Sequence, residues 1–407
     1  MKRFFTLFIL YLGVVTSIFS QGINLNQGSI KQEKYLQKIQ YQNINGKIVV
    51  PVTINGKMYK FIIDTGAPLT ISEKLFKDIN PQIIGNAAIA DASGRKKEAT
   101  IIMLPELHLQ EITFINTPGF VLREESSDFI NILECLGIDG IIGSNMLRNS
   151  IIQFDAQSEH VLITNNYNQI PKKKVVIGQK MELTPSQSSP IITVIFQKKG
   201  LKRIGDRALF DSGASDFYSM SIRAFNWLES RLEVVKIAES EGSFEWGFHG
   251  TFEKQYHLLL SIPALHVNKT IFDNVIVSTT HSTSRIGAQI FQYGKTTLDF
   301  KKKRFYFELF DNINTDNLFE RPWAIMPTWQ NDKLEVGIIW DKTFESEINL
   351  GDEVLSINGF DIQAMDACEY LKSDEIRSSN EDRILVIKNI KTGEIKKIEI
   401  KRLQLIE

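Results

Sequence analysis

Two short segments of the sequence carry the same potentially reactive residues. Residues 61–67 read Phe-Ile-Ile-Asp-Thr-Gly-Ala, and residues 208–214 read Ala-Leu-Phe-Asp-Ser-Gly-Ala. Each is an apolar run that ends abruptly in an aspartate, a hydroxyl residue and a glycine, which is typical of a strand followed by a tight turn. Two carboxylates that a fold brings together can share one proton, so that one acts as a general base and the other as a general acid. Asp64 and Asp211 are therefore the first candidates for chemistry.

The two segments belong to a longer internal repeat. Residues 141–144 read Ile-Ile-Gly-Ser, and residues 285–288 read Arg-Ile-Gly-Ala. Asp155 and Asp299 follow these segments at matching positions. One Asp-hydroxyl-Gly tripeptide is weak evidence, but two of them with the same later landmarks indicate a duplicated unit. Short alternating segments with many turn signals lie between the landmarks, so each repeat is expected to form a small β-barrel-like lobe.

The paired motifs resemble those of the aspartic peptidases, in particular of their retropepsin-like branch. The resemblance rests on the two Asp-Thr/Ser-Gly-Ala sequences, each with a downstream Ile-Gly pair, and it covers roughly residues 41–310. It implies an aspartic endopeptidase in which two lobes meet so that Asp64 and Asp211 face one another as a catalytic dyad. Because both halves lie on one chain, the catalytic unit is expected to be a monomer. The resemblance implies polypeptide substrates. The six histidines are scattered and form no metal-site pattern, so we expect no metal and no cofactor.

The resemblance also implies roles for residues around the dyad, namely Thr65, Gly66, Gly143, Ser212, Gly213 and Gly287. The two hydroxyl residues would form interlocking hydrogen bonds beneath the dyad. The glycines that follow them would let the backbone turn tightly and keep amides close to the carboxylates. The two later glycines would allow a strand to pass closely under each loop.

Three positions depart from the pattern of many acid-acting relatives. Ala67 and Ala214 stand where a hydroxyl residue often donates a hydrogen bond to a carboxylate. Loss of a bond to the charged form raises the pKa of the pair, so we expect an activity optimum at mildly acidic to neutral pH. Pro68 removes a backbone donor next to the first loop. Together with the lack of a recognisable flap tyrosine, it favours a rival interpretation, a non-catalytic peptide-binding scaffold.

Two hairpins are candidates for flaps that cover a substrate. The first is Ala88–Ile102, with its turn at residues 92–94, and the second is Ser243–Leu258. The second is rich in aromatic residues, which would either grip a peptide or pack into the core of the second lobe. The sequence leaves both possibilities open.

The pattern changes from about residue 319. Residues 350–359 read Leu-Gly-Asp-Glu-Val-Leu-Ser-Ile-Asn-Gly, which resembles a segment of PDZ domains. A short helix near residues 365–371 and a hairpin over residues 384–401 complete a PDZ-like α+β domain. The glycine-rich loop with which PDZ domains bind peptide C-termini is not evident. Capture of peptide C-termini, substrate tethering, regulation and structural support therefore remain open.

The N-terminus predicts export. Lys2 and Arg3 precede an apolar run from Phe4 to Phe19, which is typical of a secretory signal peptide, and an uncleaved anchor is the alternative. We expect a periplasmic or extracellular protein with no stable membrane span after removal of the signal. A formal net charge of −1 gives no attraction to nucleic acid.

The predicted fold is mainly β, with two pseudo-symmetric aspartic-peptidase lobes followed by the PDZ-like domain. Its parts are a signal peptide (1–20), an N-terminal extension (21–40), an N-terminal lobe (41–165), a C-terminal lobe (166–310) and the PDZ-like domain (319–404). Cys135 and Cys368 fall in different parts, so we expect no disulfide between them. Cys135 lies in an apolar stretch and is expected to be buried and inert.

Overall fold

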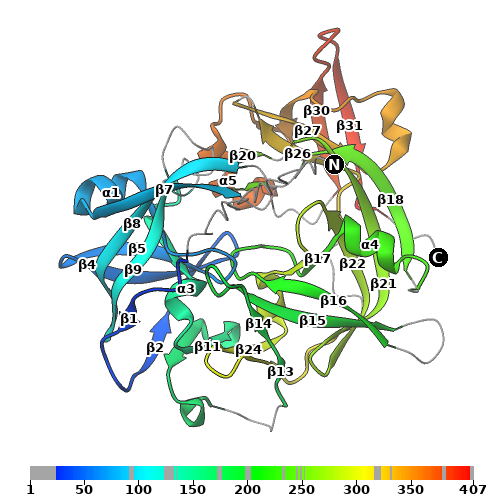
Figure 1. Ribbon diagram of the computed structural model, residues 1–407. Helices are drawn as coiled ribbons and strands as arrows, with labels where there is room; N and C mark the ends of the chain where they lie inside the picture. Colours follow the sequence, from blue (N-terminus) through cyan, green and yellow to red (C-terminus); the bar gives the residue numbers. More distant parts are fainter. Residues whose placement is uncertain are drawn as a thin grey trace, which may run out of the picture.

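The computed structural model is mainly β, and its strands form two lobes and a smaller C-terminal domain (Figure 1). The mainly β, two-lobed fold predicted from the sequence is confirmed. Within the part of the chain that is described, no helix combines the length and the apolar character needed to cross a bilayer. The described residues are 24–90, 96–122, 133, 135–171, 177–197, 203–231, 234–243, 246–247, 250–251, 253–315, 322–330, 332–377 and 382–403.

The N-terminal lobe is a sheet with the strand order β1-β9-β6-β10-β5-β4-β8-β7, in which β9 also pairs with β8. The short helix α1 (Glu73–Ile79) connects β6 to β7, and the short helix α3 (Ser144–Leu147) follows β10. Ser72 caps α1 by accepting a hydrogen bond from the Leu75 amide. The strands are β1 (Ser29–Ile30), β3 (Gln42–Ile44), β4 (Lys47–Ile54), β5 (Lys57–Asp64), β6 (Thr70–Ser72), β7 (Gln82–Ala90), β8 (Lys96–Leu109), β9 (Ile112–Leu122) and β10 (Gly140–Gly143).

The second lobe repeats this connectivity. Its order β22-β17-β23-β16-β15 matches β9-β6-β10-β5-β4 of the first lobe, and β18 and β21 match β7 and β8. One helix, α4 (Ile222–Leu228), takes the place of α1. The strands are β14 (Glu182–Leu183), β15 (Pro190–Gln197), β16 (Arg203–Phe210), β17 (Tyr218–Ser221), β18 (Val235–Gly242), β19 (Trp246–Gly247), β20 (Gly250–Thr251), β21 (Gln255–Val267), β22 (Thr270–Thr280) and β23 (Arg285–Ile286).

A third sheet joins the two lobes and lies at the bottom of the view in Figure 1. It has the order β13-β25-β24-β11-β12-β2, and the pairing of β11 with β24 brings equivalent strands of the two repeats together. The segment predicted to be an N-terminal extension is part of the lobes, because β2 pairs with β12 and β1 pairs with β9. The strands are β2 (Leu36–Gln40), β11 (Ile151–Asp155), β12 (His160–Thr164), β13 (Gln179–Lys180), β24 (Gly294–Asp299) and β25 (Arg304–Leu309).

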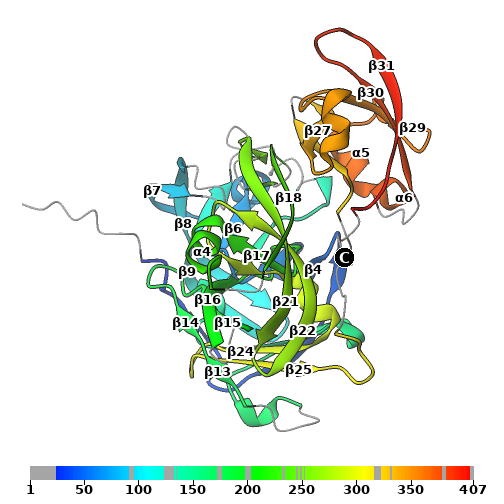
Figure 2. The same cartoon turned by 90° about the vertical axis from the view of Figure 1, so that its right-hand side faces the viewer.

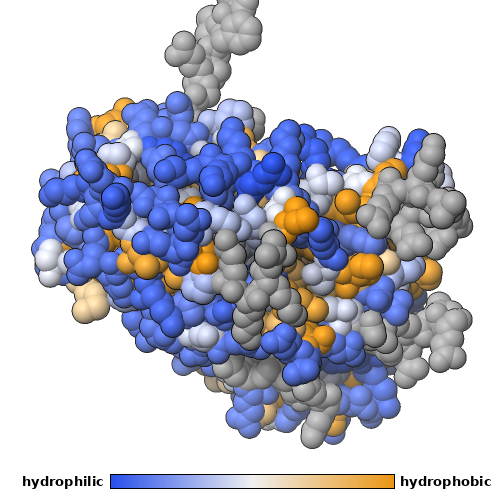
Figure 3. Space-filling model, turned by 90° about the horizontal axis from the view of Figure 1, so that it is seen from below, coloured by the Kyte–Doolittle hydropathy of each residue, from blue (hydrophilic) through white to orange (hydrophobic). Residues whose placement is uncertain are grey.

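One apolar core runs through both lobes and the sheet that joins them. At their junction the rings of Phe154 in β11 and Phe291 stack with centroids 4.4 Å apart, and Phe210 packs against Phe305. Burial of large apolar side chains of this kind supplies most of the driving force for docking the lobes. The face seen in Figure 3 is by contrast mostly hydrophilic, with only scattered hydrophobic groups.

The C-terminal domain has its own apolar core, separate from that of the lobes. It stands apart from them in the view of Figure 2. Its strands and helices lie close to the positions expected from the sequence, whereas its PDZ-like identity stays a prediction. They are β26 (Ile325–Gln330), β27 (Lys333–Ile339), β28 (Glu353–Ile357), β29 (Phe360–Asp361), α5 (Ala367–Lys372), α6 (Asp374–Arg377), β30 (Arg383–Lys388) and β31 (Ile395–Ile400).

The C-terminal domain extends the sheet of the second lobe. Strand β27 pairs with β18 at Ile338 and Gly242, and the Ser243 amide donates to the Gly337 carbonyl at 2.9 Å. The approach is close, since a Cβ atom added at Gly242 would lie 2.3 Å from the Gly337 oxygen. A small apolar cluster that includes Leu259 of the second lobe and Ile338 of the C-terminal domain packs at this junction.

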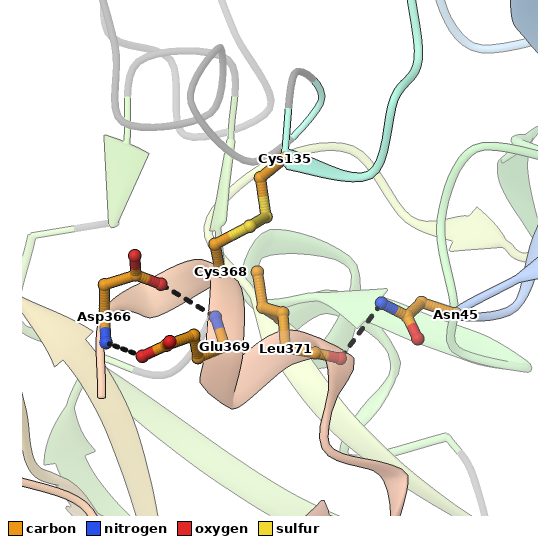
Figure 4. The surroundings of a disulfide bond; sticks show 6 residues. All are labelled: Asn45, Cys135, Asp366, Cys368, Glu369 and Leu371. Carbon is orange, nitrogen blue, oxygen red and sulfur yellow. Dashed lines mark hydrogen bonds between the residues drawn. A yellow bond between two sulfur atoms is a disulfide. The ribbon is translucent and has the colours of Figure 1, made fainter. Parts of the chain in front are cut away.

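A disulfide ties the same domain to the first lobe, and this overturns our expectation for the two cysteines. Cys135 precedes β10, Cys368 lies in α5, and their Cα atoms are 5.6 Å apart (Figure 4). Beside them the Asn45 side-chain amide donates to the Leu371 carbonyl at 3.2 Å. The expectation was wrong because it took membership of different domains as separation in space. The domains dock so that α5 meets the segment before β10.

Replacement of Cys368 by serine should lower the stability of the docked protein by about 2–4 kcal/mol, because the link closes a long loop between two domains. Thermal unfolding under non-reducing conditions measures the loss as a lower Tm. Cys135→Ser and the double variant should match the single variant, since each removes the same bond. Equal Tm values for wild type and all three variants would show that the tie does not contribute.

Candidate active site

Asp64 and Asp211 lie at equivalent positions of the two lobes. Asp64 ends β5, and Asp211 directly follows β16. In each lobe a later strand runs parallel beside the aspartate strand: β10 pairs with β5 up to Gly143 and Asp64, and β23 pairs with β16. Hydrophobic strands that end together therefore hold both carboxylates at the same edge of their lobes.

Each carboxylate accepts hydrogen bonds from the backbone amides two and three residues after it. The Gly66 and Ala67 amides donate to Asp64 Oδ1 at 2.8 and 3.1 Å. In the second lobe the Gly213 and Ala214 amides donate to Asp211 Oδ1 at 3.0 and 3.1 Å. The turn after each strand therefore fixes the orientation of its carboxylate.

The two loops lie so close that each glycine packs against the aspartate of the other lobe. A Cβ atom added at Gly66 would lie 2.6 Å from Asp211 Cγ, and one added at Gly213 would lie 2.3 Å from Asp64 Oδ2. Backbone without a side chain is thus required at both positions. The structure brings the two candidate acids together across the boundary between the lobes.

The hydroxyl residues of the two motifs cross between the lobes beneath the acids. The Thr65 amide donates to Ser212 Oγ and the Ser212 amide donates to Thr65 Oγ1, both at 3.0 Å. The Thr65 hydroxyl in turn donates to the Phe210 carbonyl at 2.6 Å, and the Ser212 hydroxyl donates to the Ile63 carbonyl at 2.8 Å. Both side chains are fully buried. This closed network sets the separation of the acids.

The environment raises the pKa of Asp64 to about 8. Burial is the largest cause, followed by the charge of Asp211, while the Gly66 amide and Lys47 act in the opposite direction. Two carboxylates in contact cannot both be charged at low cost, so the pair retains a proton around neutral pH. A pair that holds one proton can donate at one oxygen and accept at another.

The two later glycines lie where a strand passes under each acidic loop. A Cβ atom at Gly143 would lie 2.1 Å from the Pro68 carbonyl carbon, and one at Gly287 would lie 2.2 Å from the backbone carbonyl oxygen of Asp216. The residue after each of these glycines holds the acidic loop by a backbone hydrogen bond. The Ser144 amide donates to the Ala67 carbonyl at 2.9 Å, and in the second lobe the Ala288 amide donates to the Ala214 carbonyl at 2.8 Å.

Pro68 does not deprive Asp64 of a donor that Asp211 has. Both carboxylates accept from the amides two and three residues after the aspartate, and Pro68 follows these positions. The next amide, that of Leu69, donates instead to Asn145 Oδ1 at 2.8 Å. The presence of Pro68, which favoured a non-catalytic scaffold, therefore leaves the set of amide donors to Asp64 complete.

Three residues that sequence reasoning missed reach the loops from the opposite lobe. The Lys47 ammonium donates to the Gly213 carbonyl. Gln187 Nε2 and Ser189 Oγ approach the Gly66 carbonyl at 2.9 and 3.3 Å. Alignment of the repeats on their strands would have marked Lys47 and Ser189 as equivalent positions. The sequence holds no signal that their side chains cross between lobes.

The structure describes the predicted flaps only in part. The first forms the hairpin of β7 and β8, and its turn, residues 91–95, lies outside the described residues. In the second, residues 244–245, 248–249 and 252 lie outside them, as does the side chain of Trp246. Tyr256 is 39% exposed and donates to Glu239 at 2.6 Å, so it does not pack into the core.

Comparison with known proteins gives a partial match. A family model described as Aspartyl protease matches residues 50–146, which span the first lobe from β4 to α3 and include Asp64. Among solved structures, the crystal structure of the aspartic proteinase from Irpex lacteus is similar to this chain at 11% sequence identity and a TM-score of 0.40, over 68% of this chain and 98% of that one. No curated protein matches.

Substitution of Thr65 by valine should destabilise the protein by about 2–4 kcal/mol, because it leaves the Ser212 amide and the Phe210 carbonyl buried without a partner. Chemical denaturation measures the loss. Thr53→Val in β4 makes the same chemical change at a half-buried position and serves as the control. An equal effect of the two substitutions would rule out a special contribution from the crossed hydroxyl network.

Stability should fall as the pH rises from about 5 to about 8, since the folded protein holds a proton on Asp64 that the unfolded chain releases near pH 4. In Asp64→Asn this dependence should become flatter by up to about 1.4 kcal/mol per pH unit. Thermal or chemical unfolding across this range measures the slope. Asp78→Asn, at an exposed carboxylate with a lowered pKa, should run parallel to wild type above about pH 5. If the stability of Asp64→Asn changed with pH as steeply as that of wild type, the raised pKa of Asp64 would be contradicted.

Proposed function

We propose that this chain is an aspartic endopeptidase that hydrolyses peptide bonds with Asp64, Asp211 and a water molecule. The observation that carries the proposal is the contact of the two acidic loops, in which each glycine packs against the opposite aspartate. The match of the first lobe to an aspartyl protease family supports it. The repeat of the same motif and strand connectivity in the second lobe extends that support to Asp211.

The proposed mechanism uses the one proton that the pair retains. The ionised carboxylate takes a proton from water as the water oxygen attacks the carbonyl carbon of the peptide bond. The protonated carboxyl donates its proton to the carbonyl oxygen and so stabilises the tetrahedral intermediate. The carboxyl that took the proton from water then gives it to the amide nitrogen, and the other carboxylate takes back a proton from a hydroxyl of the intermediate as the carbon–nitrogen bond breaks, so the pair again holds one proton. No cofactor or metal takes part in these steps.

Enzymatic activity accounts for two buried, facing carboxylates better than a peptide-binding scaffold does. Burial of two facing carboxylates costs stability, because desolvation and mutual repulsion disfavour their charged forms. A binding protein gains nothing from this cost. The raised pKa of Asp64, about 8, supports activity at mildly acidic to neutral pH, as expected for loops with Ala67 and Ala214 after the glycines.

The PDZ-like domain is proposed to support the lobes structurally rather than to capture peptide C-termini. Trp329 of β26 and Tyr370 of α5 stack with ring centroids 6.1 Å apart, so these side chains fill the space between that strand and that helix. The same helix carries Cys368 of the disulfide. Disulfides persist in oxidising compartments, and this supports export to the periplasm or the extracellular space.

Replacement of Asp64 or Asp211 by asparagine should lower kcat/KM on a peptide library by about a thousandfold or more, because neither variant can hold an ionised and a protonated carboxyl side by side. Asp78→Asn, on the outer face of the first lobe, should cleave like wild type. The pH optimum of the wild type should lie between about pH 5 and 7. Equal cleavage by wild type and both dyad variants would remove the proposed mechanism. Absence of wild-type cleavage would favour a peptide-binding scaffold.

A further inference from the structure

Lys47 brings a positive charge from the first lobe to the back of the Asp211 loop. It is the first residue of β4, and its ammonium donates to the Gly213 carbonyl and, at 2.9 Å, to the Ser215 hydroxyl. Its side chain is only partly exposed. A lysine held by two oxygen atoms of a catalytic loop is placed to act on that loop.

The contact passes through a single peptide group to the carboxylate of Asp211. The Gly213 carbonyl belongs to the same peptide as the Ala214 amide, and that amide donates to Asp211 Oδ1 at 3.1 Å. A cation on the carbonyl oxygen polarises the peptide and strengthens its N–H as a donor. A stronger hydrogen bond to a carboxylate favours its ionised form.

The loop of the first lobe has the same geometry without the charge. The Gly66 carbonyl accepts from the neutral side chains of Gln187 and Ser189, while the Ala67 amide of that peptide donates to Asp64 Oδ1 at 3.1 Å. The strand pairing puts Lys47 and Ser189 at equivalent positions, because Val49 pairs with Ile62 and Ile191 pairs with Leu209. One lysine therefore breaks the pseudo-twofold symmetry of the pair.

We propose that Lys47 is a positioning residue that directs the shared proton of the pair to Asp64 and leaves Asp211 as the carboxylate that activates water. This inference rests on the proposed peptidase function, and it gives the two acids different roles. Asp64 then donates to the carbonyl oxygen of the substrate, and Asp211 accepts the proton of the attacking water.

The charged groups around Lys47 agree with this assignment. Asp211 attracts it most strongly, followed by Asp64 and Asp216, while Arg285 repels it. Burial lowers the pKa of Lys47 and the three carboxylates oppose that effect. Arg285 and Asp216 contact one another at 3.4 Å, so their opposite effects on Lys47 partly cancel.

Removal of the charge tests the inference through the pH profile of kcat/KM. In Lys47→Met both limbs of the profile should move to higher pH by about one unit, because the cation no longer favours ionised carboxylates. Lys47→Gln keeps a hydrogen-bond donor and should shift by a similar amount, and Lys47→Arg should restore the wild-type limbs. Lys57→Met is the matched control, since Lys57 is an exposed lysine paired with Asp78. Unshifted limbs in Lys47→Met and Lys47→Gln would overturn the inference.

A second measurement does not require activity. Carboxyl resonances of ¹³C-aspartate, assigned with Asp64→Asn and Asp211→Asn, report which acid is protonated near pH 6. Asp64 should carry the proton in wild type, and this preference should weaken in Lys47→Met. A proton on Asp211, or an unchanged preference in the variant, would refute the assignment. Failure of the proposed function has a different signature, namely no peptide cleavage by wild type at any pH.

Discussion

The crossed hydrogen bonds of Thr65 and Ser212 are the interaction on which the site depends. Each hydroxyl accepts from a backbone amide of the other lobe and donates to a carbonyl two residues before the opposite hydroxyl position. All partners are buried, so a small shift of one lobe against the other would break these hydrogen bonds where no water can replace them. The network therefore imposes a fixed spacing on two acids that repel one another, and the protein fold bears the cost of that repulsion.

The rest of the architecture reinforces this junction. Below it, β11 and β24 join the lobes in one sheet, with the N-terminal strand β2 at its edge. Above it, the C-terminal domain contacts both lobes, one through strand pairing and the other through the disulfide. Two lobes that would otherwise be free to rock about their contact are thus held at both ends. Rigid support of this kind would keep the two aspartates in the geometry that the proposed reaction requires.

The different roles that we propose for the two aspartates require a departure from the symmetry of the duplicated fold. Symmetric loops would leave the shared proton with no preference between the acids. The residues that contact the two loops at equivalent positions are not identical, because Lys47 of the first lobe corresponds to Ser189 of the second. The asymmetry arises outside the two Asp-hydroxyl-Gly motifs, in side chains that reach across the lobe boundary.

The sequence by itself determined the local features: the two Asp-hydroxyl-Gly turns at strand ends, the repeat, the mainly β pattern and the strands of the C-terminal domain. These depend on alternation of apolar residues and on turn chemistry, which act over a few residues. Only the tertiary structure decided the disulfide between Cys135 and Cys368, the incorporation of residues 29–40 into the lobes, and the reach of Lys47 to Gly213. These contacts join positions far apart in the chain, and they depend on how whole sheets dock, which no local pattern of residues records.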